Sequence, residues 1–482
     1  MLFNSPVFLF CFLPIALALH WLVPWRFRNF ILLALSVVFY WWGGSSVIGI
    51  LFFSMALNWV TGLFIGCLRD RVARVLAISF GVTANLLLLA YYKYFTLFLG
   101  LPVSDLPAGI IPLGISFYTF HSVSYLVDLY REIKKPFLNP IDFALYIALF
   151  PQLIAGPIVR FHDIADQIAH RSQTWDRLRS GCERFIFGLA KKVLLADSLG
   201  VVADDIFALS GPDLSTSHAW LGLVCFSLQI YYDFSGYSDM AIGLARLFGF
   251  ELLENFNYPY LADSITDFWH RWHLSLSAWF RDYLYIPLGG NRCGNIAVYR
   301  NLLIVFLLCG LWHGPNWNFV AWGAYHGAFL ILEKRLNLRA LLPAFVRHVY
   351  ALLVVGFGWV IFRTTNMAQA WLFLETLLGI ESGSPYGAGV AILLDVEFYV
   401  ALAAGLLLAF PVFTFLASDF RGRSFPNKAT HLVGCPAWLI SGLNGNPALL
   451  ATVRALVCLL LFLLSCSQLA THTARSFIYF NF

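Results

Sequence analysis

Residues 301–319 read NLLIVFLLCGLWHGPNWNF, and this stretch decides how the chain can fold. Its first half is almost uninterrupted apolar sequence, as a membrane helix requires, but it leads into a histidine followed by Gly314 and Pro315. Pro315 has no N–H to donate and its ring would collide with the carbonyl of Leu311, so the helix must kink or break beside His313. Broken helices at membrane depth line cavities, because the freed backbone groups need partners. The stretch therefore predicts a membrane protein in which His313 faces a cavity.

The composition of the whole chain agrees with a membrane location. The 482 residues are 60% hydrophobic and 12% charged, whereas about a quarter of the residues of a soluble globular protein are charged. The net charge of +5 is scattered, with no basic block that would indicate nucleic acid. Nine cysteines without CxxC spacing fit small buried side chains, not disulfides or a zinc site. The opening segment lacks the basic start of a signal peptide, so we expect it to be a retained first span.

Twelve segments approach the roughly 20 apolar residues that a membrane helix needs. They lie near residues 5–23, 27–42, 46–67, 73–92, 110–130, 142–158, 183–209, 217–250, 301–332, 346–378, 392–417 and 448–470. The predicted fold class is therefore an all-α integral membrane bundle of about 11–12 helices, some of them re-entrant. We expect a single domain with N-terminal helices (1–158), a core that carries the chemistry (159–345) and C-terminal helices (346–482).

Charges in the connections predict the orientation of the bundle. Residues 24–29, 68–74 and 131–140 are rich in Arg and Lys, whereas residues 43–46 carry no charge and the connection containing Lys93 is nearly neutral. Because cytoplasmic loops carry the excess of Arg and Lys, the N-terminus is expected to face away from the cytoplasm.

Two later segments depart from this regular alternation. Residues 142–158 contain Pro151, Gly156 and Pro157, which fit either a re-entrant segment or a kinked span. Residues 160–182 alternate charged and apolar side chains, which predicts an amphipathic helix at the cytoplasmic surface; a solvated loop is the alternative.

Residues 227–250, SLQIYYDFSGYSDMAIGLARLFGF, place several charges within one predicted span. Each ionised side chain at mid-bilayer costs about 2.5–3.5 kcal/mol, so Asp233, Asp239 and Arg246 must pair, face the interior or reach a hydrated cavity. Asp233 and the nearby Tyr237 are candidates for lining a substrate path. A purely structural ion-pair cluster is the other interpretation.

Residues 264–292 also carry too many charges for lipid exposure. Ser264 and Asp267 resemble a helix N-cap, and in the helix expected to follow, Asp267 should neighbour Arg271. His270 and His273 form an HxxH pair, but the HExxH of metalloproteases and the grouped histidines of di-iron enzymes are absent, so we expect no metal.

His313 combines several features that suggest chemistry. A helix entering near Arg300 would place it about 20 Å along, just past the middle of a roughly 30 Å hydrocarbon core. A desolvated imidazole should be neutral there and could act as general base for a hydroxyl attacking an activated acyl group. Asn316, His273 and Asp267 are all candidates for orienting it, and Trp312 provides bulk beside it. A structural histidine with a single hydrogen bond is the alternative for this residue, and a transporter or channel is the alternative for the whole protein.

The motifs RWHLSLSAWFRDYLYIPLGGNR and GLWHGPNWNFVAWGAYHG resemble those of the membrane-bound O-acyltransferase (MBOAT) superfamily. Within it, QIYYDFSGYSDMAIGLARLFGF, FGLAKKVLLAD, FPQLIAGPIVR and the terminal SFIYFNF are similar to the branch of bacterial alginate O-acetyltransferase membrane subunits. The resemblance covers the whole chain. It implies a helical bundle with a central tunnel, in which His313 of the WHG motif is catalytic and His273 of the RWH motif is also important.

The same resemblance implies an activity and partners. An acyl thioester, most plausibly acetyl-CoA, would arrive from the cytoplasm, and a periplasmic acetyltransferase would finish O-acetylation of an exported polysaccharide such as alginate, together with the synthesis and export machinery. The protein would lie in the bacterial inner membrane. Cellulose, peptidoglycan and D-alanylated teichoic acid are alternative products. We also considered that Lys191 and Lys192, or the Arg171–Arg179 cluster, attract the phosphates of the donor; positive-inside topology explains these cations equally well.

Overall fold

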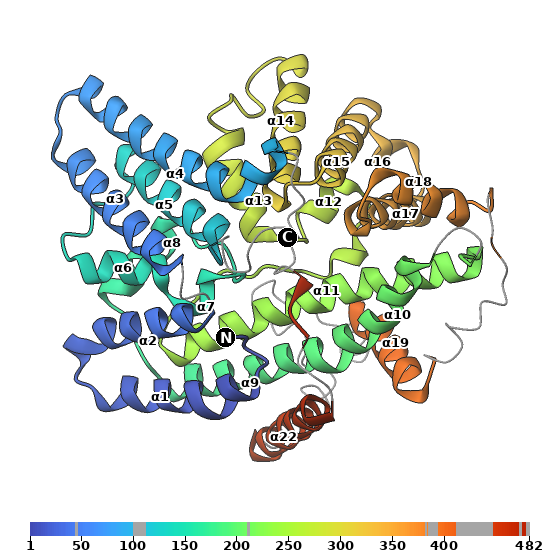
Figure 1. Ribbon diagram of the computed structural model, residues 1–482, viewed down its shortest axis with the longest axis horizontal. Helices are drawn as coiled ribbons and strands as arrows, with labels where there is room; N and C mark the ends of the chain where they lie inside the picture. Colours follow the sequence, from blue (N-terminus) through green and yellow to red (C-terminus); the bar gives the residue numbers. More distant parts are fainter. Residues whose placement is uncertain are drawn as a thin grey trace.

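Two long helices cross the middle of the molecule side by side (Figure 1). They are α9 (Trp175–Ala190) and the 32-residue α11 (Thr216–Leu247), most of whose central side chains are buried. A Cβ atom on Gly188 of α9 would lie 2.6 Å from the carbonyl oxygen of Gly236 on α11. The two backbones can therefore touch only because both positions are glycine.

The computed structural model describes residues 1–43, 47–99, 112–209, 213–380, 383, 394–410, 447–471 and 475–478. Across these ranges the regular structure is helical, with one isolated antiparallel bridge between Phe256 and Trp272. The other helices are α1 (Leu13–Leu22), α2 (Arg28–Gly43), α3 (Ile48–Cys67), α4 (Arg71–Leu99), α5 (Ile115–Tyr130), α6 (Pro140–Ala148), α7 (Phe150–Leu153), α8 (Phe161–Ala169), α10 (Asp197–Ala208), α12 (Ile265–Trp269), α13 (Leu274–Phe280), α14 (Asn295–His313), α15 (Trp317–Leu336), α16 (Leu338–Leu341), α17 (Ala344–Arg363), α18 (Met367–Leu377), α19 (Val396–Ala409) and α22 (Pro447–Thr471). Short π- or 3-10-helical segments are η1 (Phe8–Phe12), η2 (Trp25–Phe27), η5 (Lys191–Ala196), η6 (Pro259–Leu261) and η7 (Arg281–Tyr285). The predicted all-α fold is confirmed.

Five helices in the described part of the chain are long and apolar enough to cross a membrane: Ile48–Cys67, Arg71–Tyr94, Asn295–His313, Ala344–Arg363 and Ala451–Thr471. The other predicted spans are shorter, as in α19, or too polar, as in α11. The chain is a helical membrane protein, and the larger count of 11–12 membrane helices stays a prediction.

The region of residues 142–158 is irregular, as expected. Helix α6 ends at Ala148, α7 occupies four residues, and a non-helical segment leads to α8. The amphipathic prediction for the following residues is confirmed over α8, which buries Phe161, Ile164 and Ile168. The break agrees with both alternatives for this region, a re-entrant segment and a kinked span.

The stretch 301–332 forms two helices that pack against each other as a hairpin. Helix α14 ends at His313 and α15 begins at Trp317, so the predicted break beside the histidine is confirmed. The expected helix start near Arg300 is wrong, because α14 begins at Asn295, and the predicted mid-span depth of His313 stays a prediction. The Gly-Pro pair terminates the helix outright and does not merely kink it.

Two other local predictions are wrong. Lys93 lies within α4 with its side chain buried, not in a connection. The helix expected after Ser264 stops at Trp269, because His273 adopts a left-handed backbone conformation (φ 47°) that breaks it before α13. The N-cap itself is confirmed, since the Ser264 hydroxyl accepts a hydrogen bond from the amide of Asp267.

Candidate functional site

The ring of His313 faces a narrow cavity of about 20 Å³ at the end of α14. Only 8% of the residue is solvent-exposed. Trp322 and Phe362 meet the imidazole edge-on, with ring centroids 5.2 and 5.1 Å away. The cavity is also lined by Ile230, Asp233, Phe234, Trp272, Trp359 and Ile478. The imidazole therefore stands between aromatic walls and a space with room for about one water-sized group.

The carbonyl groups freed by the helix break find partners on α4. The hydroxyl of Tyr94 donates to the carbonyl of Leu311 (2.6 Å), which is the acceptor that Pro315 cannot use. The ammonium group of Lys93 donates to the carbonyl of Trp312. These two contacts fix the last turn of α14 and thereby the backbone that carries His313.

His273, the second predicted histidine, is held by an amide. Its Nδ1 lies 3.0 Å from Oδ1 of Asn255, an oxygen that also accepts from the hydroxyl of Ser275 (2.9 Å). The Nδ2 group of Asn255 donates to the hydroxyl of Ser238 on α11 (3.1 Å). Because the amide oxygen can only accept, Nδ1 of His273 carries the proton, and Nε2 of the neutral ring is the acceptor.

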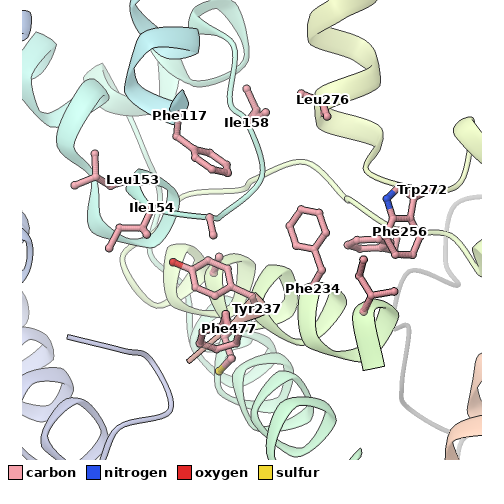
Figure 2. Close-up of a cluster of buried hydrophobic side chains, with 14 of the residues drawn as sticks. Phe117, Leu153, Ile154, Ile158, Phe234, Tyr237, Phe256, Trp272, Leu276 and Phe477 are labelled. Carbon is pink, nitrogen blue, oxygen red and sulfur yellow. The ribbon is translucent and has the colours of Figure 1, made fainter. Parts of the chain in front are cut away.

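Phe234 links the two histidines. Its ring packs edge-on against His273, with centroids 4.6 Å apart, and it lines the cavity that His313 faces. Figure 2 shows Phe234 projecting from α11 beside Phe256 and Trp272. Tyr237, which follows Phe234 on α11, packs against Phe477. The structure therefore brings His313 and His273 to the same region of the core.

Asp233 and Ile478 form another part of the cavity lining. One carboxylate oxygen of Asp233 accepts a hydrogen bond from Nζ of Lys192 (2.5 Å), and the other accepts one from the backbone N–H of Ile478 (2.9 Å). Lys192 also contacts Asp197 (2.8 Å) and the carbonyl of Ser476 (3.2 Å). Asp233 thus lines the cavity, as predicted, and also anchors Ile478 as part of its wall.

Lys191 belongs to a neighbouring buried ion cluster. Asp239 accepts from Lys191 (2.6 Å) and from Arg184 (2.8 Å), and Arg184 also pairs with Glu254. The expectation that the intramembrane charges avoid lipid is confirmed for Asp233 and Asp239. A donor phosphate would have to compete with these carboxylates for Lys191 and Lys192, and donor binding by either residue stays a prediction.

Four other predicted site residues do not line the cavity. Trp312 stacks on Phe120 with centroids 5.4 Å apart, and Tyr237 stacks on Phe3 at 4.9 Å, so both pack within the core. Asp267 pairs with Arg271 (2.8 Å), and Asn316 caps α15 and donates to the carbonyl of Thr365 (2.9 Å). The ring of Trp312 also meets His313 edge-on, with centroids 4.9 Å apart, so it provides bulk beside the histidine as expected. The lining or orienting roles of the other three residues stay predictions.

The two histidines of the HxxH pair have different surroundings. His270 is exposed, whereas His273 is buried. The described residues contain no group of three or more His, Cys, Asp or Glu side chains that could hold a metal ion.

Sequence reasoning missed several residues of the site. Asn255 lies in an irregular connection without periodicity, and its role depends on a partner 18 residues away. Trp272, Trp359 and Phe362 line the cavity but resemble ordinary core aromatics in the sequence. No local signal distinguishes them, although the broken helix did indicate that a cavity should exist.

Comparisons with known proteins agree with this geometry. The sequence profile of the membrane-bound O-acyltransferase family matches residues 86–370. The chain is 41% identical to the probable alginate O-acetylase AlgI of Azotobacter vinelandii, with all of both chains covered. It is 34% identical to the peptidoglycan O-acetyltransferase of Helicobacter pylori over 80% of this chain and 81% of that one. The teichoic acid D-alanyltransferase of Bacillus subtilis is 29% identical over 45% and 58% of the two chains.

Proposed function

Since this chain belongs to the membrane-bound O-acyltransferase family and is an O-acyltransferase, we propose that it supplies acetyl groups for the O-acetylation of an exported polysaccharide, with alginate as the first candidate. The observation that carries the proposal is a buried histidine at a broken helix end, facing a narrow cavity lined by aromatic side chains and Asp233. The full-length similarity to a probable alginate O-acetylase supports the choice of acetyl group and polymer.

In the proposed reaction, His313 acts as general base. It removes the proton from an acceptor hydroxyl while the oxygen attacks the thioester carbonyl. The carbon–sulfur bond breaks, the ester forms, and the departing thiolate takes up the proton. His273, held by Asn255, assists through the acceptor nitrogen Nε2 by accepting a hydrogen bond from the attacking hydroxyl and so orienting it; contact with the thioester would require a proton on Nε2.

The donor in this proposal is acetyl-CoA or another acyl thioester presented from the cytoplasm. The protein lies in the bacterial inner membrane with its N-terminus outside, as the basic connections indicate. A periplasmic acetyltransferase then transfers the acetyl group to the polymer, next to the synthesis and export machinery.

Replacing His313 by Ala tests the proposal. Loss of a general base costs about 10²–10⁴-fold in rate, so polymer acetylation should fall at least about 100-fold in cells that depend on this protein. The exposed His270→Ala variant is the matched control and should keep its activity. Membrane extraction and gel filtration establish that both variants fold.

Normal polymer acetylation by a folded His313→Ala protein would show that the histidine is not the base. The acceptor is tested separately by measuring ester-linked acetate on alginate and on peptidoglycan. Acetate lost only from peptidoglycan would move the acceptor assignment to that polymer, in keeping with the relative from Helicobacter pylori.

A further inference from the structure

A groove of about 580 Å³ shares no lining residue with the cavity at His313. We call it the rim groove, and its lining includes Trp25, Arg26, Asn29, Phe30, Asp142 and Arg171. It is formed by the α1–α2 connection, the start of α6 and the residues that follow α8. The proposed acyl-transfer step does not use the groove, although Arg171 belongs to the Arg171–Arg179 cluster that is a candidate for attracting the donor's phosphates.

Arg171 is a cation that the described residues leave incompletely satisfied. Only 9% of it is exposed. Its Nε donates to the carbonyl of Phe248 (3.1 Å) and its Nη1 to Oδ1 of Asn29 (2.6 Å), so these partners are neutral oxygens. Its Nη2 has no hydrogen-bond partner among the described residues. The guanidinium also lies over the rings of Phe250 (4.5 Å) and Trp25 (5.4 Å), and Nη2 itself is covered. The positive charge at the wall of the groove thus has no hydrogen-bonded carboxylate among the described residues, which favours an anion in the groove.

The charge of Arg171 persists at neutral pH. Burial lowers its pKa to about 10, and the neighbouring Arg28 contributes to the same shift. The lining contains two arginines, Arg26 and Arg171, against the single carboxylate of Asp142, which leaves a net charge of +1. Both carboxylate oxygens of Asp142 already accept hydrogen bonds, one from Asn29 (2.7 Å) and the other from Asn139 (3.1 Å).

The rim of the groove is apolar and exposed, unlike a site for a water-soluble anion. Trp25 and Phe30 are about half exposed, at 47% and 52%, next to the exposed Arg26. From Phe30 an exposed apolar stripe continues along α2 through Ala34, Val38 and Trp41, at helical spacing. Aromatic rings beside arginines are typical of the level at which lipid headgroups lie, and basic pockets between helices at that level bind anionic headgroups.

We propose that the rim groove binds the phosphate of an anionic phospholipid headgroup, with Arg171 and Arg26 as its ligands and the acyl chains lying along the α2 stripe. The acyl chains distinguish this ligand from free phosphate, because free phosphate has no apolar part that could contact the α2 stripe.

The test uses the purified full-length protein in an uncharged detergent. Its thermal unfolding is followed by tryptophan fluorescence while dioctanoyl phosphatidylglycerol, dioctanoyl phosphatidylcholine or inorganic phosphate is added. Phosphatidylglycerol should raise the Tm in a saturable way, and the other two should not. Each arginine near a headgroup contributes a factor of about five in affinity, so Arg26→Gln and Arg171→Gln should each weaken the apparent affinity by about that factor.

Arg179→Gln is the matched control, because this arginine is exposed and pairs with Asp176 away from the groove. It should respond as the wild type does, and an equal loss of affinity in this control would overturn the proposal. Equal shifts with phosphatidylcholine would overturn it as well, and equal shifts with inorganic phosphate would assign the site to the free anion and not to a lipid. Arg26 is exposed, so its variant decides the matter even if Arg171→Gln fails to fold.

Discussion

Single side chains in this protein act through the groups that hold them. His273 has a left-handed backbone conformation at the start of α13, which turns its ring into the core, and Asn255 accepts its Nδ1–H there. The same amide oxygen satisfies Ser275, so one residue fixes both the orientation and the tautomer of the histidine.

Replacing Asn255 by Ala should therefore impair both stability and transfer. Each buried donor left without an acceptor costs about 1–3 kcal/mol, so the Tm should fall along with the acetylation rate. Unfolding in detergent and cellular polymer acetylation measure the two effects, with the exposed Asn257→Ala as control. If the amide acts through His273, adding His273→Ala to Asn255→Ala should lower the rate little further, and fully additive losses would contradict this.

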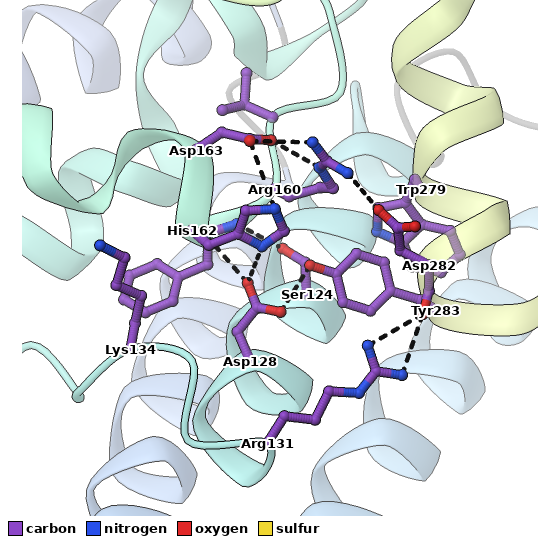
Figure 3. Close-up of polar contacts among 12 residues, drawn as sticks. Ser124, Asp128, Arg131, Lys134, Arg160, His162, Asp163, Trp279, Asp282 and Tyr283 are labelled. Atoms are coloured by element: carbon purple, nitrogen blue, oxygen red, sulfur yellow. Dashed lines mark hydrogen bonds and ion pairs between the residues drawn. The ribbon is translucent and has the colours of Figure 1, made fainter. Parts of the chain in front are cut away.

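His162 forms a second histidine centre near the surface (Figure 3). A hydrogen bond from its Nδ1 to the buried Asp128 (2.8 Å) raises the pKa of His162 above the ordinary 6.5. Asp128 also accepts from the hydroxyl of Tyr283 (2.8 Å), so the protonated histidine joins α5, α8 and η7.

The sign of the resulting pH dependence follows from the raised pKa. The stability contributed by protonated His162 is fully present below pH 6.5 and is lost as the pH rises through the folded-state pKa. The Tm of the wild type should therefore fall more between pH 6 and pH 8.5 than that of His162→Asn. The exposed His170→Asn variant should retain the wild-type slope, and identical slopes for all three proteins would refute the assignment.

At the scale of elements, the α14–α15 hairpin sets the position of His313. A Cβ on Gly310 would collide with the carbonyl oxygen of Phe319 and would lie 3.4 Å from Cα of Gly323. The obstacle is backbone on both sides, so the two helices would have to separate to admit even one methyl group.

Gly310→Ala should accordingly lower the Tm. It should also displace His313, so the rate of polymer acetylation should fall as well. Overpacking typically costs about 1–3 kcal/mol. Gly294→Ala, at the start of the same helix, has open space around the added methyl and should be nearly neutral. An unchanged Tm for Gly310→Ala would contradict the close packing of α14 against α15 at this position.

The elements also show what sequence reasoning can reach. Pro315 imposes a local steric restriction, so the break beside His313 could be predicted, whereas the start of α14 at Asn295, ahead of Arg300, could not. Lys93 and Tyr94 hold the carbonyls of that broken end from a helix more than 200 residues earlier in the chain. No periodicity encodes such a contact, because it arises from the packing of α4 against the end of α14.

At the scale of the whole molecule, buried charges join helices that would otherwise be held only by packing. Arg184 of α9 and Lys191 of η5 converge on Asp239 of α11. If one residue of such a cluster is removed, the remaining charged side chains stay buried without a partner of opposite charge, in an environment that solvates them poorly.

Asp239→Asn should therefore destabilise the protein by about 3–5 kcal/mol, seen as a large drop in Tm or in yield from membranes. Asp176→Asn breaks the exposed pair with Arg179 and should cost no more than about 1 kcal/mol. Comparable effects of the two substitutions would show that the Asp239 cluster is hydrated in the membrane.

The positive and negative charges lie on different helices, and this affects how the chain is inserted into the membrane. The α9–η5 segment brings the cations, and α11, synthesised after it, brings Asp233 and Asp239. Without α11, Arg184 and Lys191 would lack their shared partner Asp239, and Lys192 would keep only Asp197. We expect the insertion machinery to retain the α9–η5 segment until α11 emerges, so that the paired charges enter the bilayer together.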